Sequence, residues 1–283
     1  MNYRHAYHAG SFADVIKHAV LVRILVHLCA KPQAFRVIDT HAGAGRYDLL
    51  GPEASRTGEW REGIGRLLAA SLGPEAKTLI APYLAAVRSF NRDDECRIYP
   101  GSPLLARALM RRQDRLVACE LEPGAAKALG HALKGDEHAK AIAIDGWTAL
   151  NAYVPPKERR GLVVVDPPFE QADDFTRLAG GLEQAHRKWP AGIYLLWYPI
   201  KDRAGPDALA RRLKRTGIAK VLRAELMVFP PNDFDRLNGS GLIVVNPPWM
   251  LEKELATLLP ALVDVLAREG RGGVRLDWLA DEK

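Results

Sequence analysis

The stretch that decides the fold is residues 161–169, Gly-Leu-Val-Val-Val-Asp-Pro-Pro-Phe. Its four consecutive apolar residues, three of them β-branched, are typical of a strand buried on both faces of a parallel sheet. The two prolines cannot donate ladder hydrogen bonds, so the strand must end at Asp166. Ligands bind outside the carboxyl ends of such strands, although an isolated acid there is equally suited to capping the next helix.

Composition limits the class of protein. With 283 residues, 48% of them hydrophobic, the chain is long enough to bury a large core and is expected to be soluble and globular. Its net charge of +6 favours a polyanionic partner. No apolar run is long enough to cross a membrane and the first residues do not resemble a signal peptide, so we expect a cytoplasmic protein.

Cysteine usage argues against a metal site. Cys29, Cys96 and Cys119 are odd in number and far from any Cys-x-x-Cys spacing, so they are expected to be reduced thiols. We therefore predict no bound metal.

The first residues mix aromatic and basic side chains, beginning with Tyr3 and Arg4. Such a mixture suits base stacking and phosphate contact, which is one use of a segment of this kind. A helix is expected over 12–29 because Ser11 and Asp14 form a capping-box pattern and apolar residues then recur at helical spacing. His18 lies on or beside that apolar stripe, where a histidine taken alone is more often structural than a ligand contact.

A glycine-rich turn follows the next expected strand, which ends at Asp39. The turn, residues 40–45, does not complete the Gly-x-Gly-x-x-Gly pattern of dinucleotide enzymes, so a pyrophosphate cradle is disfavoured. Strand patterns then disappear, and residues 46–100 have helical spacing punctuated by prolines. We predict an inserted helical subdomain over 46–100 and one main domain made of 1–45 and 101–283.

Alternating strand and helix patterns in the main domain predict an α/β fold with a doubly wound, mostly parallel sheet. Four of its strands end in Asp39, Glu120, Asp145 and Asp166, which are therefore expected at one edge of the sheet. So many carboxylates would repel a phosphate-bearing cofactor and would suit a nucleoside with a positive centre. This chemistry points to S-adenosylmethionine.

Together these motifs resemble a known family, the 23S rRNA adenine-N6 methyltransferases called RlmJ. The resemblance covers nearly the whole chain. Its motifs are Tyr3-Arg4-His5, His8-Ala9-Gly10, residues 39–47, Tyr99-Pro-Gly-Ser-Pro103, Asp145-Gly146, Asp166-Pro-Pro-Phe169, Trp197-Tyr198-Pro199 and residues 241–249.

The resemblance implies a class I methyltransferase with a Rossmann-like sheet and an inserted helical subdomain. It implies that Asp166 is the catalytic acid and that Tyr3 lies against the RNA. It also implies a set of residues around the cofactor, which reverses the structural interpretation of His18: His18, His41, Ser102, Glu120, Asp145 and Gly146. We add Lys17, next to His18, and the strand-end acids Asp39 and Asp166 to the candidate cofactor residues, and Arg4 to the candidate RNA residues.

Two proline pairs compete for the catalytic role, because Asn246-Pro-Pro-Trp249 also resembles the motif of enzymes that methylate amines. Asp166 ends the fourth expected strand, which is the position that the fold reserves for the acceptor, so we choose Asp166. The family motif usually ends in tyrosine, and here it ends in Phe169, which keeps the ring face for stacking but has no hydroxyl.

The expected reaction is transfer of the methyl group to the N6 amine of an adenine in 23S rRNA. The Asp166 carboxylate and the Pro167 carbonyl would accept the two N–H bonds of that amine, and Phe169 would stack on the extruded base. We expect the substrate to be protein-free rRNA or an early assembly intermediate, and the enzyme to be a monomer. Two alternatives remain: a DNA adenine-N6 or cytosine-N4 methyltransferase, and a non-catalytic RNA-binding module.

Overall fold

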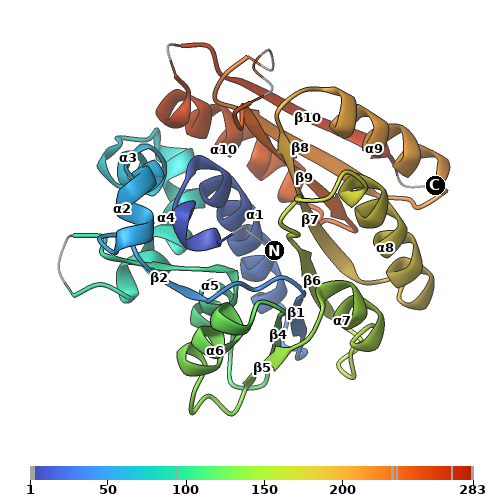
Figure 1. The fold of residues 1–283 in the computed structure, drawn as a ribbon. Helices are drawn as coiled ribbons and strands as arrows, with labels where there is room; N and C mark the ends of the chain where they lie inside the picture. The colour runs from blue at the N-terminus through green and yellow to red at the C-terminus, as the bar shows by residue number, and fades with distance from the viewer. Residues whose placement is uncertain (1–3, 93–94, 231–232, 234, 269, 282–283) are drawn as a thin grey trace.

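The buried run 161–165 forms a strand in the middle of an eight-stranded sheet with the order β10-β8-β9-β7-β6-β1-β4-β5 (Figure 1). The computed structural model describes residues 4–92, 95–230, 233, 235–268 and 270–281. The strands are β1 (Arg36–Asp39), β4 (Arg115–Glu120), β5 (Ala139–Ala143), β6 (Gly161–Val165), β7 (Ile193–Ile200), β8 (Val221–Met227), β9 (Gly239–Val245) and β10 (Gly273–Ala280).

The sheet is mostly parallel. β1 pairs in parallel with β4 and β6, and the pairs β4–β5 and β6–β7 are also parallel. β9 is antiparallel to both β7 and β8, and β10 is antiparallel to β8. The chain runs from β1 outward to β4 and β5, then returns to β6 on the other side of β1. This reversal places a topological switch point between β1 and β6, and the predicted α/β class is confirmed.

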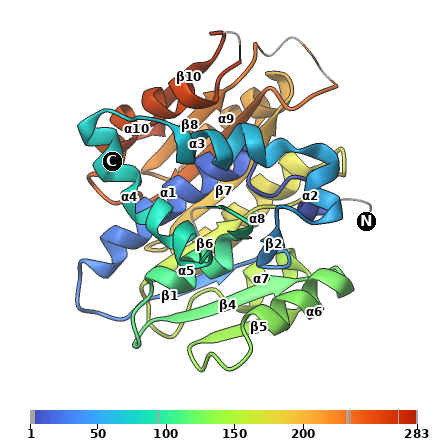
Figure 2. The ribbon, with the colours of Figure 1, turned by 90° about the vertical axis from the view of Figure 1, so that its left-hand side faces the viewer.

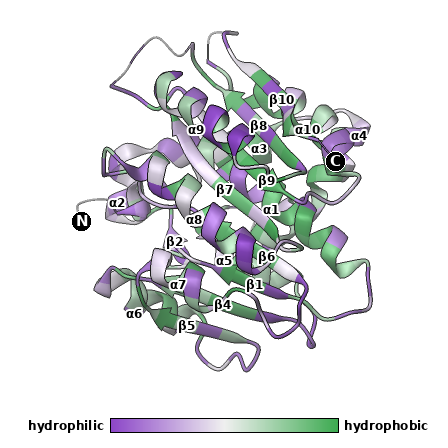
Figure 3. Cartoon of the chain, turned by 90° about the vertical axis from the view of Figure 1, so that its right-hand side faces the viewer, coloured by the Kyte–Doolittle hydropathy of each residue, from purple (hydrophilic) through white to green (hydrophobic). Residues whose placement is uncertain are grey.

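Helices cover both faces of the sheet, as Figures 2 and 3 show from opposite sides. The larger hydrophobic cluster joins one face to α1 (Phe12–Cys29), α4 (Pro74–Ser89), α5 (Ser102–Leu109), α6 (Pro123–Ala132) and α10 (Leu251–Leu266). A second cluster joins the other face to α7 (Gly146–Ala152), α8 (Asp174–Lys188) and α9 (Ala204–Arg215). The strands between them are apolar on both sides, as expected for a parallel sheet covered by helices.

Helix α1 has the predicted bounds, but its first turn differs from a capping box. The Ser11 side chain makes no capping hydrogen bond. Asp14 instead accepts a hydrogen bond from the backbone N–H of Gly10, 2.9 Å away. The helix is buried nearly all round, including Asp14 and Lys17. Buried charges need partners, so Asp14 and Lys17 must form ion pairs or hydrogen bonds inside the protein.

The segment 46–100 is mainly helical, with α2 (Pro52–Thr57), η2 (Arg61–Gly65), α3 (Arg66–Ala69) and α4. The prediction that strands are absent from it is wrong at both ends. β2 (Arg46–Asp48) and β3 (Ile98–Pro100) form a short antiparallel pair in which Tyr47 lies opposite Tyr99. Three-residue strands are too short to show an alternating pattern in the sequence. The pair brings the two ends of the segment together beside the glycine-rich turn.

Candidate active site

The four strand-end acids lie at one edge of the sheet, as predicted. Asp39 is opposite Val164 in the register of β1 with β6, two residues before Asp166. Glu120 is likewise two residues beyond Ala118, the partner of Asp39 on β4. Asp39 is therefore set deeper in the sheet than its neighbours, and its exposed fraction is 1%.

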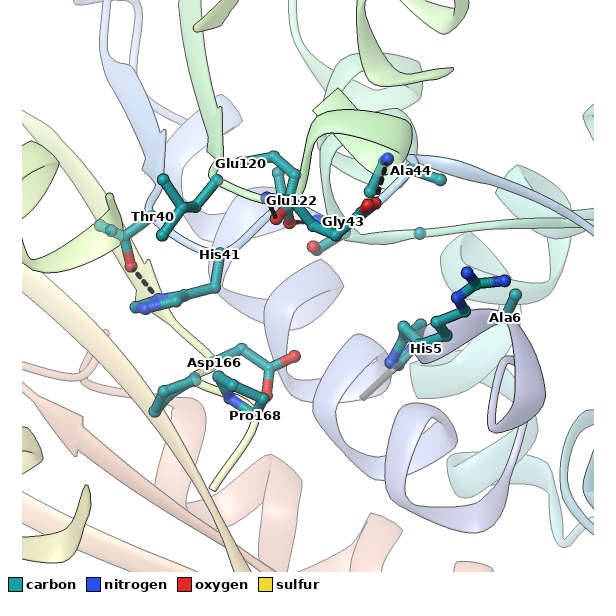
Figure 4. A pocket seen from close by; sticks show the side chains of 18 of the residues that line it. His5, Ala6, Thr40, His41, Gly43, Ala44, Glu120, Glu122, Asp166 and Pro168 are labelled. Atoms are coloured by element: carbon teal, nitrogen blue, oxygen red, sulfur yellow. Dashed lines mark hydrogen bonds between the residues drawn. The ribbon is translucent and has the colours of Figure 1, made fainter. Parts of the chain in front are cut away.

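A cavity of about 580 Å³ opens above this edge. Figure 4 shows Glu120, His41 and Asp166 arranged around a common space with His5 on its far side. Of the candidate cofactor residues, eight line this cavity: Lys17, His18, His41, Ser102, Glu120, Asp145, Gly146 and Asp166. Pro167 and Arg4 also line it, whereas Tyr3 lies outside the described residues.

Asp39 is the candidate cofactor residue that does not line the cavity. Neither of its oxygens has a hydrogen-bond partner among the described residues. Burial raises its pKa to about 7, against the opposing influence of the nearby Ser102 hydroxyl, which does not reach full hydrogen-bond geometry. A contact between Asp39 and the cofactor therefore stays a prediction, because the sequence pattern does not reveal how deep each strand ends.

Asp39 gives the protein a measurable dependence of stability on pH. Its pKa is higher in the folded state than in the unfolded chain, so the folded state binds more protons between about pH 4 and 7 and stability falls as the pH rises through that window. We expect the free energy of unfolding, measured in urea, to fall less between about pH 5 and pH 8 in Asp39→Asn than in the wild type. The exposed Asp264→Asn serves as control, and equal losses in both variants would contradict the assignment.

The glycine-rich turn is fixed by Glu120. Its Oε2 accepts a hydrogen bond from the backbone N–H of Gly43 at 2.9 Å, and its Oε1 accepts one from Glu122 at 2.8 Å. Gly43 has a φ of +61°, and a Cβ there would lie 2.2 Å from the Tyr47 hydroxyl. Glu120 thus holds two loops together while its carboxylate faces the cavity, a structural role that the sequence did not reveal.

Asp145 and Gly146 form the neighbouring part of the cavity wall. Asp145 Oδ2 accepts hydrogen bonds from the backbone N–H of Thr148 at 2.8 Å and from its hydroxyl at 2.9 Å. Gly146 is required by close packing, because a Cβ there would lie 2.4 Å from the Thr40 carbonyl oxygen and 2.5 Å from the His41 ring. Asp145 therefore caps helix α7 and also lines the cavity.

His41 is a neutral acceptor. The Thr40 hydroxyl donates to the Val164 carbonyl at 2.9 Å, so it must accept the bond from His41 Nδ1, 2.8 Å away. His41 is thereby assigned the tautomer with Nδ1 protonated and Nε2 bare. Burial lowers its pKa to about 4. The ring edge packs on Trp147, a cavity residue that the sequence reading missed, with centroids 5.3 Å apart.

A buried ion cluster lies next to the predicted catalytic acid. Lys17 Nζ forms ion pairs with Asp166 Oδ2 and, at 2.8 Å, with Asp14 Oδ1. Burial opposes the charge on Lys17, but the two carboxylates outweigh it and raise its pKa well above the usual value. Asp14 Oδ2 also accepts a hydrogen bond from His5 Nε2 at 3.0 Å. Asp14 therefore connects the first turn of the chain to Lys17 and, through it, to Asp166.

A second cavity, of about 650 Å³, meets the first at Asp166. Lys17, Pro168 and Asp166 line both. Phe169 lines only the second, with a φ of +51° that turns its ring toward Phe175 and Trp197, at centroid distances of 4.9 and 5.6 Å. This cavity has an aromatic side formed by Phe169, Trp197 and Phe229. Its lining carries charges of both signs, from segments far apart in the sequence: Lys17, Lys201, Arg236 and Arg268 with Asp14, Glu59, Glu62, Asp166, Glu170 and Asp235.

The competing Asn246 motif lies at the opposite edge of the sheet. β9 is antiparallel to β7, and its last residue Val245 pairs with Tyr194 near the start of β7. The Asn246 amide donates to the carbonyl oxygens of Pro190 and Gly192, both at 2.7 Å, so its side chain ties two loops together. The geometry supports the choice of Asp166.

No group of His, Cys, Asp and Glu side chains in the described ranges is arranged to hold a metal ion. No helix in those ranges combines the length and apolar character that a membrane crossing requires.

Comparison with known proteins identifies the family. A family model described as "Ribosomal RNA large subunit methyltransferase D, RlmJ" matches residues 32–280. The chain is 40% identical to "Ribosomal RNA large subunit methyltransferase J" of Escherichia coli (strain K12) over 282 residues, and 40% identical to the protein of the same name from Haemophilus influenzae over 283 residues. Both matches cover 100% of each chain.

A solved structure agrees with this grouping. Protein LPL1258 from Legionella pneumophila is 31% identical, with a TM-score of 0.87, and the match covers 95% of this chain and 98% of that one. The resemblance predicted from the motifs is thus confirmed, and the chain belongs to the RlmJ family of ribosomal RNA large subunit methyltransferases.

Proposed function

We propose that this methyltransferase transfers a methyl group from S-adenosylmethionine to the N6 amine of an adenine in 23S rRNA. The observation that carries the proposal is the position of Asp166 where two cavities meet, among the residues that line both. The lining of the first cavity includes the acids Glu120 and Asp145 with His18 and His41, and that of the second includes aromatic rings and charges of both signs. A methyl donor in the first and a nucleotide in the second would approach each other beside this carboxylate.

The donor set of the first cavity fits S-adenosylmethionine. Carboxylates at Glu120, Asp145 and Asp166 suit hydroxyls, an exocyclic amine and a positive centre, and they repel phosphate. His18 lines this cavity, and its buried Nε2 has no hydrogen-bond partner among the described residues, which is consistent with a group that binds a ligand. S-adenosylmethionine supplies an activated methyl group when bound.

The acceptor side supports an amine in a flat base. Asp166 Oδ2 is held by Lys17, which leaves Oδ1 to accept one N–H of the amine. The Pro167 carbonyl is suited to accept the other, which would localise the nitrogen lone pair and aim it at the methyl group. Phe169 offers a ring face for the base, worth about 1–3 kcal/mol per stacked base. The missing hydroxyl of Phe169 does not affect this contact.

The RNA should be held by cations of the second cavity, Lys201, Arg236 and Arg268, and by the first residues of the chain. Arg4 lines the first cavity, and we propose that it contacts an RNA phosphate. Tyr3 is proposed to lie against the target base. We further propose that residues 46–100 act as an RNA-contacting subdomain, that the enzyme acts in the cytoplasm as a monomer, and that protein-free rRNA or an early assembly intermediate is its substrate.

The test is transfer of labelled methyl groups to protein-free 23S rRNA, followed by digestion and identification of the modified nucleoside. We expect N6-methyladenosine at one site. Methylation of duplex or single-stranded DNA at a higher kcat/KM than rRNA would support the DNA methyltransferase alternative. A chain that binds rRNA but no S-adenosylmethionine in calorimetry would support the non-catalytic module.

Glu120→Ala is expected to weaken cofactor binding by about 10- to 100-fold, because the ribose hydroxyls lose a charged acceptor and the Gly43 turn loses its anchor. Isothermal calorimetry with S-adenosylhomocysteine measures this change. Glu137→Ala, an exposed acid before β5, is the matched control and should bind normally. Unchanged affinity in the Glu120 variant would remove Glu120 from the cofactor site.

A further inference from the structure

A chain of three buried side chains runs from the inserted segment to the first cavity. The Tyr83 hydroxyl on α4 lies 2.9 Å from the Tyr99 hydroxyl on β3, which lies 2.7 Å from His18 Nδ1 on α1. All three side chains are at most 1% exposed. Burial raises the pKa of both phenols and lowers that of His18 to about 3, so all three groups stay neutral over the working range of pH.

The direction of the protons in this chain follows from counting donors. Among the described residues, Tyr83 has no hydrogen-bond partner for its hydroxyl other than Tyr99. If His18 Nδ1 donated to Tyr99, then Tyr99 would donate to Tyr83 and the Tyr83 proton would be buried without an acceptor, at a cost of about 1–3 kcal/mol. If Tyr83 donates to Tyr99 and Tyr99 donates to Nδ1, both hydroxyl protons are used, and the donor left without an acceptor is Nε2–H. The second arrangement is favoured because the Asp14 carboxylate, 3.9 Å from Nε2, attracts an N–H and would repel the lone pair of a bare nitrogen.

The consequence appears at the other ring nitrogen. With Nδ1 accepting, the neutral imidazole must carry its proton on Nε2. Nε2 is buried and has no hydrogen-bond partner within the described part of the chain, where Asp14 Oδ1 is 3.9 Å away. His18 lines the cofactor cavity. His41, on the same cavity, has the opposite tautomer because Thr40 accepts from its Nδ1.

We propose that Tyr99 is a positioning residue that fixes His18 with Nε2 protonated, so that His18 donates a hydrogen bond to the carboxylate of the methionine part of S-adenosylmethionine. The inference rests on the proposed function. A carboxylate needs donors, and Glu120, Asp145 and Asp166 would repel it from the rest of the cavity wall. The protonated Nε2 of His18 offers such a donor, and the charge of the Asp14 carboxylate 3.9 Å from it is balanced by Lys17, whereas His41 can only accept.

The tautomer can be measured without any ligand or turnover. Long-range proton–nitrogen correlation spectra of protein labelled with ¹⁵N-histidine distinguish a protonated Nε2 from a protonated Nδ1. His18→Asn identifies the His18 signals among those of the eight histidines. We expect protonation on Nε2 for His18 and on Nδ1 for His41. A protonated Nδ1 in His18 of the wild type would overturn the inference, whatever happens in any variant.

Tyr99→Phe tests the positioning role. It removes the donor to Nδ1, so His18 should populate both tautomers and the affinity for S-adenosylhomocysteine should fall about tenfold, the size expected for one hydrogen bond to a charged group. Affinity for 5′-methylthioadenosine, which lacks the amino-acid group, should stay within about twofold of the wild type. Tyr194→Phe is the matched control, because it also removes one buried phenol hydrogen bond, to the Trp189 carbonyl at 2.9 Å on the other face of the sheet.

The outcomes separate this inference from the function on which it rests. Equal weakening of both ligands by Tyr99→Phe would overturn the carboxylate assignment, as would equal losses in the Tyr99 and Tyr194 variants. A wild type that binds neither ligand would overturn the proposed function itself. A wild type that binds both, with Nε2 protonated and a selective loss in Tyr99→Phe, would support the inference.

Discussion

Replacing Asp166 with alanine is expected to lower methylation of protein-free rRNA by at least about a thousandfold, while the affinity for S-adenosylhomocysteine stays within about tenfold. The reason is that the Asp166 carboxylate lies where the two cavities meet and should accept a hydrogen bond from the acceptor amine. Single-turnover transfer of labelled methyl groups measures the rate, and calorimetry measures the affinity.

Asp166→Asn is the closer structural match, because it keeps the shape of the side chain and removes the charge that pairs with Lys17. It should be nearly as inactive as the alanine variant. Asn246→Ala, in the other proline motif, is the control and should retain the wild-type rate per folded molecule, because its amide bonds only backbone carbonyls at the far edge of the sheet. If Asn246→Ala were inactive and Asp166→Ala active, the catalytic role would belong to the second motif.

The fold and the edge of the sheet at which the acids lie could be predicted because local sequence patterns indicate them. Apolar runs ending in an acid indicate buried parallel strands, and parallel strands bring those acids to one edge whatever their separation in the chain. The switch point between β1 and β6 then places Asp39 and Asp166 at the edge where the cavity opens. The depth of each acid was not predictable, since it depends on the register between strands, which sets Asp39 two residues deeper than Asp166.

Contacts between distant segments could not be predicted in the same way. Lys17 and Asp166 are 149 residues apart, and nothing in either local sequence reports that they pair. The pattern of Ser11 and Asp14 is that of a capping box, and the structure uses Asp14 as the partner of Lys17 and His5. The second cavity joins side chains from the inserted segment, β7 and the end of α10, so no single stretch of sequence indicates it.

His18 shows how both interpretations of one residue can hold. Its burial and its bond to Tyr99 are those of a satisfied structural histidine, as the helical pattern indicated. The residue also lines the cavity, and its other nitrogen has no hydrogen-bond partner among the described residues, so the cofactor contact that the family resemblance implies stays a prediction. A pattern that gives burial for a whole side chain does not distinguish its two nitrogen atoms.

The ion cluster leads to the second large effect. Lys17→Met should lower the free energy of unfolding by about 3–5 kcal/mol, because Asp14 is 1% exposed and keeps a buried charge without its cation. Methylation should also fall by at least about a hundredfold per folded molecule, since Asp166 loses the partner that holds its Oδ2. Urea unfolding and rRNA methylation measure the two effects separately.

A double variant, Asp14→Asn with Lys17→Met, separates stability from catalysis. Removing the charge of Asp14 should restore most of the lost stability, because an amide oxygen can still accept from Gly10. Methylation should stay low, because Asp166 still lacks Lys17. Lys253→Met, an exposed lysine on α10, is the control and should change stability by less than about 0.5 kcal/mol. Recovery of methylation together with stability in the double variant would show that Lys17 supports the fold alone and does not hold the catalytic acid.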